Sequence, residues 1–130
     1  MTKILLVEDN ELNADMLTRR LKKRGYDVHL ATDGQQAVDL AAALSPELVL
    51  MDINLPSIDG FEATRRIRAN PSTGAVPIIA LTAHAMHSER GRCLAAGCDD
   101  FATKPIDRDT LIAVVRRWLT PAGQASCLPS

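Results

Sequence analysis

Leu48-Val49-Leu50-Met51-Asp52 is the stretch that decides the fold, because four apolar residues in a row end at a single acid. Three other apolar runs also end in polar residues: residues 3–7 before Glu8-Asp9, residues 77–81 before Thr82, and residues 101–103 before Lys104. Apolar runs separated by helical patterns are typical of buried parallel strands. Parallel strands place their carboxyl ends at one edge of a sheet, where open α/β sheets bind ligands. We therefore expect these polar side chains to meet.

The segments between these runs have helical spacing of apolar residues and end at glycine or proline. This pattern predicts helices over about residues 10–24, 34–44 and 86–96. It also predicts a helix from Phe61 that breaks at Asn70-Pro71 and a last helix capped by Asp107. Residues 27–31 have the apolar alternation of a strand. Strands and helices that alternate with short connections predict an α/β fold, a doubly wound parallel sheet of five strands. We expect one domain over residues 1–120 and a short disordered tail over residues 121–130.

Composition and charge exclude several classes of protein. The chain has 130 residues and a formal net charge of −1, so nothing global favours nucleic acid or an anionic membrane. It has neither a secretory leader pattern nor an apolar run long enough to span a membrane. Its three cysteines lack Cys-x-x-Cys spacing and suit reduced thiols. We expect a cytoplasmic protein that binds no nucleic acid and does not insert into membranes.

The order of the polar residues resembles that of the receiver domain of two-component response regulators. The resemblance rests on Glu8-Asp9, Asp52, Asn54, Thr82 and Lys104-Pro105, and it covers about residues 3–119. It implies a flavodoxin-like fold with strand order 2-1-3-4-5, in which the chain reverses direction between the strands that end at Glu8-Asp9 and Asp52. In this family the peptide bond before the proline of the Lys-Pro step is cis, which we also expect here.

Three carboxylates gathered at one edge repel one another unless a cation lies among them. A hard cation with oxygen ligands relieves this repulsion, and Mg²⁺ typically uses one or two carboxylates and keeps several waters. The resemblance implies that Asp9 and Asp52 bind Mg²⁺ directly, with Mn²⁺ as a substitute metal. It also implies that the backbone carbonyl of Asn54 is a ligand and that Glu8 acts through a bound water. Glutamate reaches farther than the usual aspartate at position 8 and is expected to shift the water network.

The resemblance assigns Asp52 as the nucleophile that accepts a phosphoryl group from a phosphohistidine. Lys104 is expected to pair with one phosphoryl oxygen, and Thr82 to hydrogen-bond another. Phe101 lies where the family keeps a mobile aromatic residue; an ordinary core phenylalanine is the alternative. The implied donor is a sensor histidine kinase or a histidine phosphotransfer protein. The surface of the fourth helix, fifth strand and fifth helix would then signal to a downstream protein.

Leu12 and Met16 are four residues apart and lie off the apolar core stripe of the first helix. An exposed apolar strip there would suit docking of the phosphodonor's helix, whereas a broad core face is the alternative. The basic residues within 19–24 favour a solvated helix end over a nucleic-acid patch. His84 and His87 lack further ligands for a metal, and His84 is expected at the mouth of the site.

Other functions remain as alternatives. A Mg²⁺-dependent phosphohydrolase of the haloacid-dehalogenase type would need an acid two residues after its nucleophile, where this chain has Asn54. A flavodoxin-like cofactor binder would need a hydroxyl- or glycine-rich phosphate loop in place of the acidic Glu8-Asp9. A receiver module of a hybrid histidine kinase is the third alternative, and the initiating Met and short tail favour a stand-alone chain. We expect no independent substrate turnover.

Overall fold

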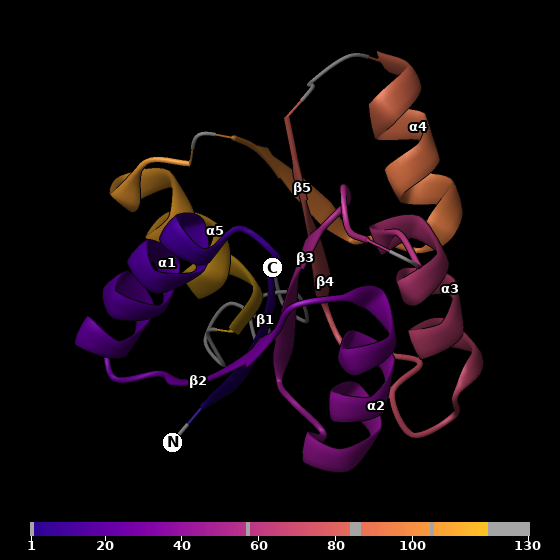
Figure 1. Cartoon of the computed structure of the whole chain (residues 1–130), viewed down its shortest axis with the longest axis horizontal. Helices are drawn as coiled ribbons and strands as arrows, with labels where there is room; N and C mark the ends of the chain where they lie inside the picture. Colours follow the sequence, from indigo (N-terminus) through magenta and orange to yellow (C-terminus); the bar gives the residue numbers. More distant parts are fainter. Residues whose placement is uncertain (1, 57, 84–86, 105, 120–130) are drawn as a thin grey trace, which may run out of the picture.

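A computed structural model describes residues 2–56, 58–83, 87–104 and 106–119. Strands and helices alternate throughout this part of the chain (Figure 1). The strands are β1 (Lys3–Val7), β2 (Asp27–Ala31), β3 (Leu48–Asp52), β4 (Ile78–Thr82) and β5 (Asp100–Thr103). The helices are α1 (Glu11–Lys23), α2 (Gly34–Leu44), α3 (Gly60–Ala69), α4 (His87–Ala96) and α5 (Arg108–Leu119).

The five strands form one parallel sheet in the order β2-β1-β3-β4-β5. Figure 1 shows α1 and α5 on one face of this sheet and α2, α3 and α4 on the other. The predicted fold class and strand order are therefore confirmed. Because β1 and β3 are neighbours and the chain leaves them in opposite directions across the sheet, their carboxyl ends flank the crevice in which such folds bind ligands.

Alternation of side chains along the strands divides the core into two clusters. On β1, Leu5 and Val7 pack toward α2, α3 and α4, whereas Ile4 and Leu6 pack toward α1 and α5. All four side chains are fully buried. Strands buried on both faces read as continuous apolar runs, which is why the sequence predicted them so clearly.

The helix ends follow from local side chains. The Asn10 side chain accepts a hydrogen bond from the Asn13 N–H (3.0 Å) and so caps the start of α1. After the end of α1, Gly25 has a left-handed backbone conformation, with φ of 89°. The Asp107 carboxylate accepts from the Thr110 N–H (2.7 Å), as expected of the cap of α5. The predicted fourth helix agrees with α4, except that its first expected residue, Met86, lies outside the described residues.

The start of α3 differs from the prediction. The sequence predicted this helix from Phe61, whereas its first residue is Gly60, and Asp59 caps it by accepting from the Glu62 N–H (2.9 Å). The pattern of an acidic residue followed by Glu three positions later is an N-terminal signature that would have located this boundary.

Several predictions fall on residues outside the described part: the cis bond at Lys104–Pro105, the placement of His84 and His87 side chains, and the tail over residues 121–130. Cys93 and Cys98 are buried thiols. No helix in the described ranges is long and apolar enough to cross a membrane.

Candidate functional site

The carboxyl ends of β1, β3, β4 and β5 bring the predicted polar residues to one edge of the sheet. In the strand register, Val7 lies opposite Met51, so Glu8 follows β1 beside Asp52 at the end of β3. Asp52 lies opposite Leu81, which precedes Thr82 at the end of β4. This juxtaposition follows from parallel pairing alone, as the sequence predicted.

Glu8, Asp9 and Asp52 form an acidic cluster. Each carboxylate offers an oxygen, and these oxygens all lie within 4.8 Å of one another. Glu8 and Asp52 are each 1% exposed, whereas Asp9 is exposed to solvent. Two nearly buried acids beside a third, accessible one make a site that is open on one side, where a ligand can enter.

Lys104 spans two of these carboxylates. Its Nζ atom lies 2.9 Å from Oδ2 of Asp52 and 3.0 Å from Oε1 of Glu8. The sequence predicted that Lys104 points into the site, but not that it pairs with Glu8. No sequence pattern links two residues so far apart; only the fold brings them together.

The pKa values of Glu8 and Lys104 shift in response to this environment. Burial raises the pKa of Glu8, and the neighbouring Asp52 charge raises it further, while the hydrogen bond from Lys104 opposes both. Burial alone would lower the pKa of Lys104, but its hydrogen bonds to Asp52 and Glu8 outweigh burial and raise it. The ammonium is therefore held charged within an acidic surrounding.

The residues present fit a divalent cation. Three carboxylates face one ammonium, which lies 3.0 Å from the buried Oε1 of Glu8, so the acidic cluster keeps an excess of negative charge. Glu8 Oε2 accepts from the Asn10 N–H (3.2 Å). Hard cations such as Mg²⁺ take carboxylate, carbonyl and water oxygens, which this edge of the sheet offers.

The loop after β3 supports the aspartate at its end. The N–H of Asn54 donates to Oδ1 of Asp52 (3.0 Å), so both oxygens of Asp52 have partners. The Gly60 N–H donates to the Ile53 carbonyl (3.0 Å), and a Cβ at Gly60 would overlap the backbone carbonyl of Asp52. This glycine is a supporting residue that the sequence analysis missed, and Asp59-Gly60 before a helix was the signal available.

Thr82 and Phe101 lie on neighbouring strands at or near this edge. Thr82 is 1% exposed, and its backbone carbonyl accepts from the Lys104 N–H (2.7 Å), which joins the ends of β4 and β5. Phe101 lies opposite Ala80 in the register and is partly buried against the cluster on the α2–α3–α4 face.

Leu12 and Met16 lie beside the acidic cluster, off the buried stripe of α1. Leu12 is 82% exposed and Met16 is partly exposed, so Leu12 is not part of a broad core face. A cavity of about 200 Å³ lies between α1 and Lys104, and Met16 and Ile106 form part of its apolar lining. An apolar strip therefore adjoins the site.

The chain matches the response regulator receiver domain family over residues 4–116. It is 41% identical to hybrid signal transduction histidine kinase I of Dictyostelium discoideum over 121 residues, which is 87% of this chain but only 7% of that kinase. It is 36% identical to the polar-differentiation response regulator DivK of Brucella ovis, over 94% of this chain and 100% of DivK.

Solved structures agree with these relatives. The receiver domain of sensor histidine kinase PA1611 from Pseudomonas aeruginosa PAO1, solved with magnesium in its active-site cleft, has a TM-score of 0.85 and 45% identity, covering 90% of this chain and 96% of that one. The chain also matches a co-crystal structure of the histidine phosphotransfer protein Ypd1 of Saccharomyces cerevisiae and the receiver domain of its downstream response regulator Ssk1. That match has a TM-score of 0.83 and 32% identity, and it covers 90% of this chain and 88% of that one. The chain therefore belongs to the response regulator receiver domain family of two-component and phosphorelay systems.

Proposed function

We propose that this receiver domain accepts a phosphoryl group on Asp52, in a Mg²⁺-dependent reaction, from a phosphohistidine on a sensor histidine kinase or a histidine phosphotransfer protein. The observation that carries the proposal is the position of Asp52, a nearly buried carboxylate within an acidic cluster and 2.9 Å from the Lys104 ammonium. The family is one of signalling proteins, and we expect no independent turnover of a substrate.

In this proposal Asp9 and Asp52 hold Mg²⁺ directly with the backbone carbonyl of Asn54, Glu8 acts through a water, and Mn²⁺ can substitute. The magnesium in the cleft of the PA1611 receiver domain and the acidic cluster of this chain support the assignment. When bound, the metal supplies positive charge that offsets the phosphoryl oxygens. Oε1 of Glu8 is already paired with the Lys104 ammonium (3.0 Å), which supports contact with the metal through a water rather than direct binding.

An oxygen of Asp52 attacks phosphorus, the N–P bond of the phosphohistidine breaks, and the imidazole leaves with a proton. Lys104 pairs with a phosphoryl oxygen and Thr82 donates its hydroxyl hydrogen to another. Lys104 already lies at Asp52 Oδ2, so its ammonium is within reach of a group formed on that carboxylate. The chain's own contribution is to position these groups and to offset charge.

The signal leaves through the surface formed by α4, β5 and α5. Phosphorylation gives Thr82 new acceptor oxygens, and movement of its side chain vacates space that Phe101 can fill by turning inward. The position of Phe101 on β5, next to the strand that ends at Thr82 and partly buried against the α2–α3–α4 face, supports this role. Phenylalanine has no polar tip, so burying its ring leaves no hydrogen bond unmade.

Leu12 and Met16 form the docking strip for the phosphodonor. The exposure of Leu12 and the position of both residues beside the acidic cluster support this role. The co-crystal structure of the Ssk1 receiver domain with Ypd1 supports a protein donor of this kind, because there a receiver domain binds a histidine phosphotransfer protein.

The receiver unit extends over residues 1–120 in this proposal and acts in the cytoplasm, without binding nucleic acid. Its place in a larger protein has two candidates. Full coverage of DivK supports a single-domain regulator, and the similarity to 7% of a hybrid kinase supports a receiver module within a kinase. In either setting the reaction at Asp52 is the same.

The proposal is tested by incubating the purified chain with acetyl phosphate and following its intact mass. We expect one added phosphoryl group that requires Mg²⁺, is prevented by EDTA, and is removed by hydroxylamine. A chain that instead releases phosphate continuously from p-nitrophenyl phosphate would be a phosphohydrolase. Absence of any labelling in the presence of Mg²⁺ would contradict the proposed function.

A further inference from the structure

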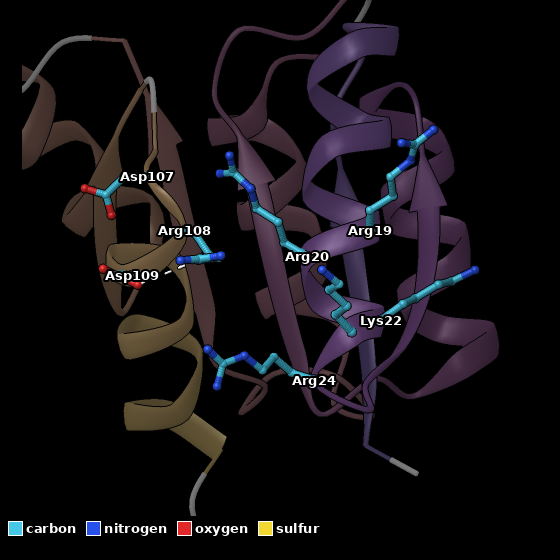
Figure 2. A pocket seen from close by; sticks show the side chains of 8 residues that line it. Arg19, Arg20, Lys22, Arg24, Asp107, Arg108 and Asp109 are labelled. Carbon is cyan, nitrogen blue, oxygen red and sulfur yellow. Dashed lines mark ion pairs between the residues drawn. The ribbon is translucent and has the colours of Figure 1, made fainter.

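A groove of about 1250 Å³ runs between the carboxyl-terminal half of α1 and the beginning of α5 (Figure 2). Six of its eight lining residues are Lys or Arg; five of these lie within residues 19–24, and the sixth is Arg108. We call this surface the basic groove. The chain as a whole has a net charge of −1, so the positive charge of the groove is a local feature.

Two acids, Asp107 and Asp109, also line the basic groove, and three of its six cations already have partners within the chain; one of these is Arg20, which donates to the carbonyl of Ile106 (3.1 Å). Arg19 pairs with Asp15 (3.1 Å) on its own helix, and Arg108 lies 3.8 Å from Asp109. Lys22, Lys23 and Arg24 form no ion pair with any residue in the described part of the chain. Cations without a neighbouring carboxylate retain their attraction for an external anion.

Helix stabilisation explains only part of this charge. Cations in the last turn of α1 interact favourably with the helix dipole, so residues 19–24 alone are unremarkable. Arg108, however, is the first residue of α5, where the dipole favours an acid rather than a cation. Figure 2 shows the guanidinium of Arg108 directed toward α1 and that of Arg24 directed toward α5. The two helices thus contribute cations to the same space.

The basic groove continues the docking strip along α1. Met16, Arg20 and Arg24 follow one another at four-residue intervals, and residues at this spacing lie on one side of a helix. Arg20 donates to the carbonyl of Ile106 (3.1 Å), which places this side next to the connection between β5 and α5. Leu12, Arg19 and Lys23 share the outward face, and Lys23 lies about 16 Å along the axis from Leu12.

We infer that the basic groove binds an acidic surface of the protein that delivers the phosphoryl group. This inference rests on the proposed function. A partner helix laid along α1 would meet apolar side chains near Asp52 and cations farther from it. The donor should therefore carry carboxylates about 10–16 Å from the apolar residues beside its phosphohistidine, the distance from Leu12 to Arg19 and Lys23 along a helix. Guanidinium groups pair with carboxylates through two parallel hydrogen bonds, which gives such an interface direction as well as attraction.

The test uses a panel of purified histidine phosphotransfer domains, phosphorylated on histidine. Half carry carboxylates about 10–16 Å from the apolar residues beside the histidine, and half do not. Phosphotransfer to the chain is measured as kcat/KM at about 20 mM and about 500 mM salt, because surface charges are screened at the higher value. The variant is Lys23→Gln/Arg24→Gln. The control is Arg65→Gln/Arg66→Gln, which removes two cations from α3 on the other face of the sheet. Labelling by acetyl phosphate, which needs no docked protein, is the reference for each chain.

We expect the acidic donors to transfer faster than the others. At low salt, kcat/KM should fall about tenfold in the groove variant and less than about twofold in the control, each relative to its own acetyl phosphate reference. At high salt the difference between the two variants should largely disappear.

The inference would be overturned if both variants lost the same rate, or if transfer did not depend on the charge of the donor. It would also be overturned if no acidic donor transferred its phosphoryl group to a chain that acetyl phosphate labels. Tighter binding of duplex DNA or anionic lipid vesicles than of the acidic donors, lost in the groove variant, would also overturn it, since the groove would then serve another polyanion. Failure of acetyl phosphate itself would instead contradict the proposed function, and the inference with it.

Discussion

Lys104 holds its ammonium 2.9 Å from Oδ2 of Asp52, and the same Nζ atom lies 3.0 Å from Oε1 of Glu8. One lysine thus offsets part of the charge of two nearly buried acids that come from different strands. A divalent cation at the acidic cluster would lie near this ammonium and be repelled by it. Lys104 therefore has two opposed effects: it disfavours the metal and favours a phosphoryl group.

Lys104→Ala should separate these effects. Loss of the ammonium should increase the affinity for Mg²⁺ by about tenfold, since the repulsion is removed. It should slow phosphorylation by acetyl phosphate by about 100-fold, the order found when one charge-stabilising donor is removed from a site. Calorimetric titration with Mg²⁺ and mass spectrometry measure the two quantities. Weaker metal binding in the variant would show that Lys104 positions the carboxylates rather than competing with the metal.

Gly60→Ala should destabilise the end of β3. A Cβ at this position would overlap the backbone carbonyl of Asp52 and lie 2.7 Å from Cα of Ile53, so the strand end or α3 must move. We expect a loss of about 1–3 kcal/mol in the free energy of unfolding and slower phosphorylation. Urea denaturation checks the first expectation. Gly91→Ala, on α4 with no atom near the added Cβ, is the control and should not destabilise; equal losses in both variants would refute the packing argument.

Thr82→Ala should uncouple the switch from the phosphorylation. The variant keeps Asp52 and the metal ligands, so it should still accept a phosphoryl group. It lacks the hydroxyl that would move to hydrogen-bond a phosphoryl oxygen. NMR of the phosphorylated protein should show large shifts for Phe101 and α5 in the unsubstituted chain and much smaller ones in Thr82→Ala. Shifts of the same size in both chains would mean that the signal bypasses Thr82.

Cys98 should make stability depend on alkaline pH. Burial raises the pKa of its thiol from 9.0 to about 11, with a hydrogen bond to Thr64 acting in the opposite direction. A raised pKa means that the folded state keeps the proton that the unfolded state loses, so this contribution is present below pH 9 and is lost as pH rises toward 11. Chemical denaturation between about pH 9 and pH 11 should show that the free energy of unfolding falls by up to about 2–3 kcal/mol more in the unsubstituted chain than in Cys98→Ala. Parallel pH profiles would contradict the assignment.

The fold could be predicted because its strands are buried on both faces. Residues 48–51 are apolar without a break, and such runs allow few other arrangements when helices separate them. The helix ends were predictable where a cap was recognised, as at Asp107, and were misplaced by one residue at Gly60, where the Asp59 cap was overlooked. Local chemistry therefore determined both the success and the error.

Contacts between distant side chains and backbone carbonyls could not be predicted. Arg68 donates to the carbonyls of Gly74 (3.0 Å), Val76 (2.6 Å) and Gly97 (2.8 Å), and it pairs with Asp99 (2.6 Å). Carbonyl groups occur at every residue, so the sequence carries no sign of which ones meet a guanidinium. The same holds for Glu8 and Lys104: the residues of the site were identifiable by type and order, but their pairing required the coordinates.

Phosphorylation of Asp52 is the step on which every other role in the site depends. The most direct measurement is to label the chain with acetyl phosphate and Mg²⁺, reduce the acyl phosphate with borohydride, and locate the product by tandem mass spectrometry. Reduction converts an aspartyl-phosphate to homoserine, so we expect homoserine at position 52 and nowhere else, and no product in Asp52→Asn. Homoserine at position 9, or a phosphoryl group retained on a histidine or serine while position 52 stays unmodified, would contradict it.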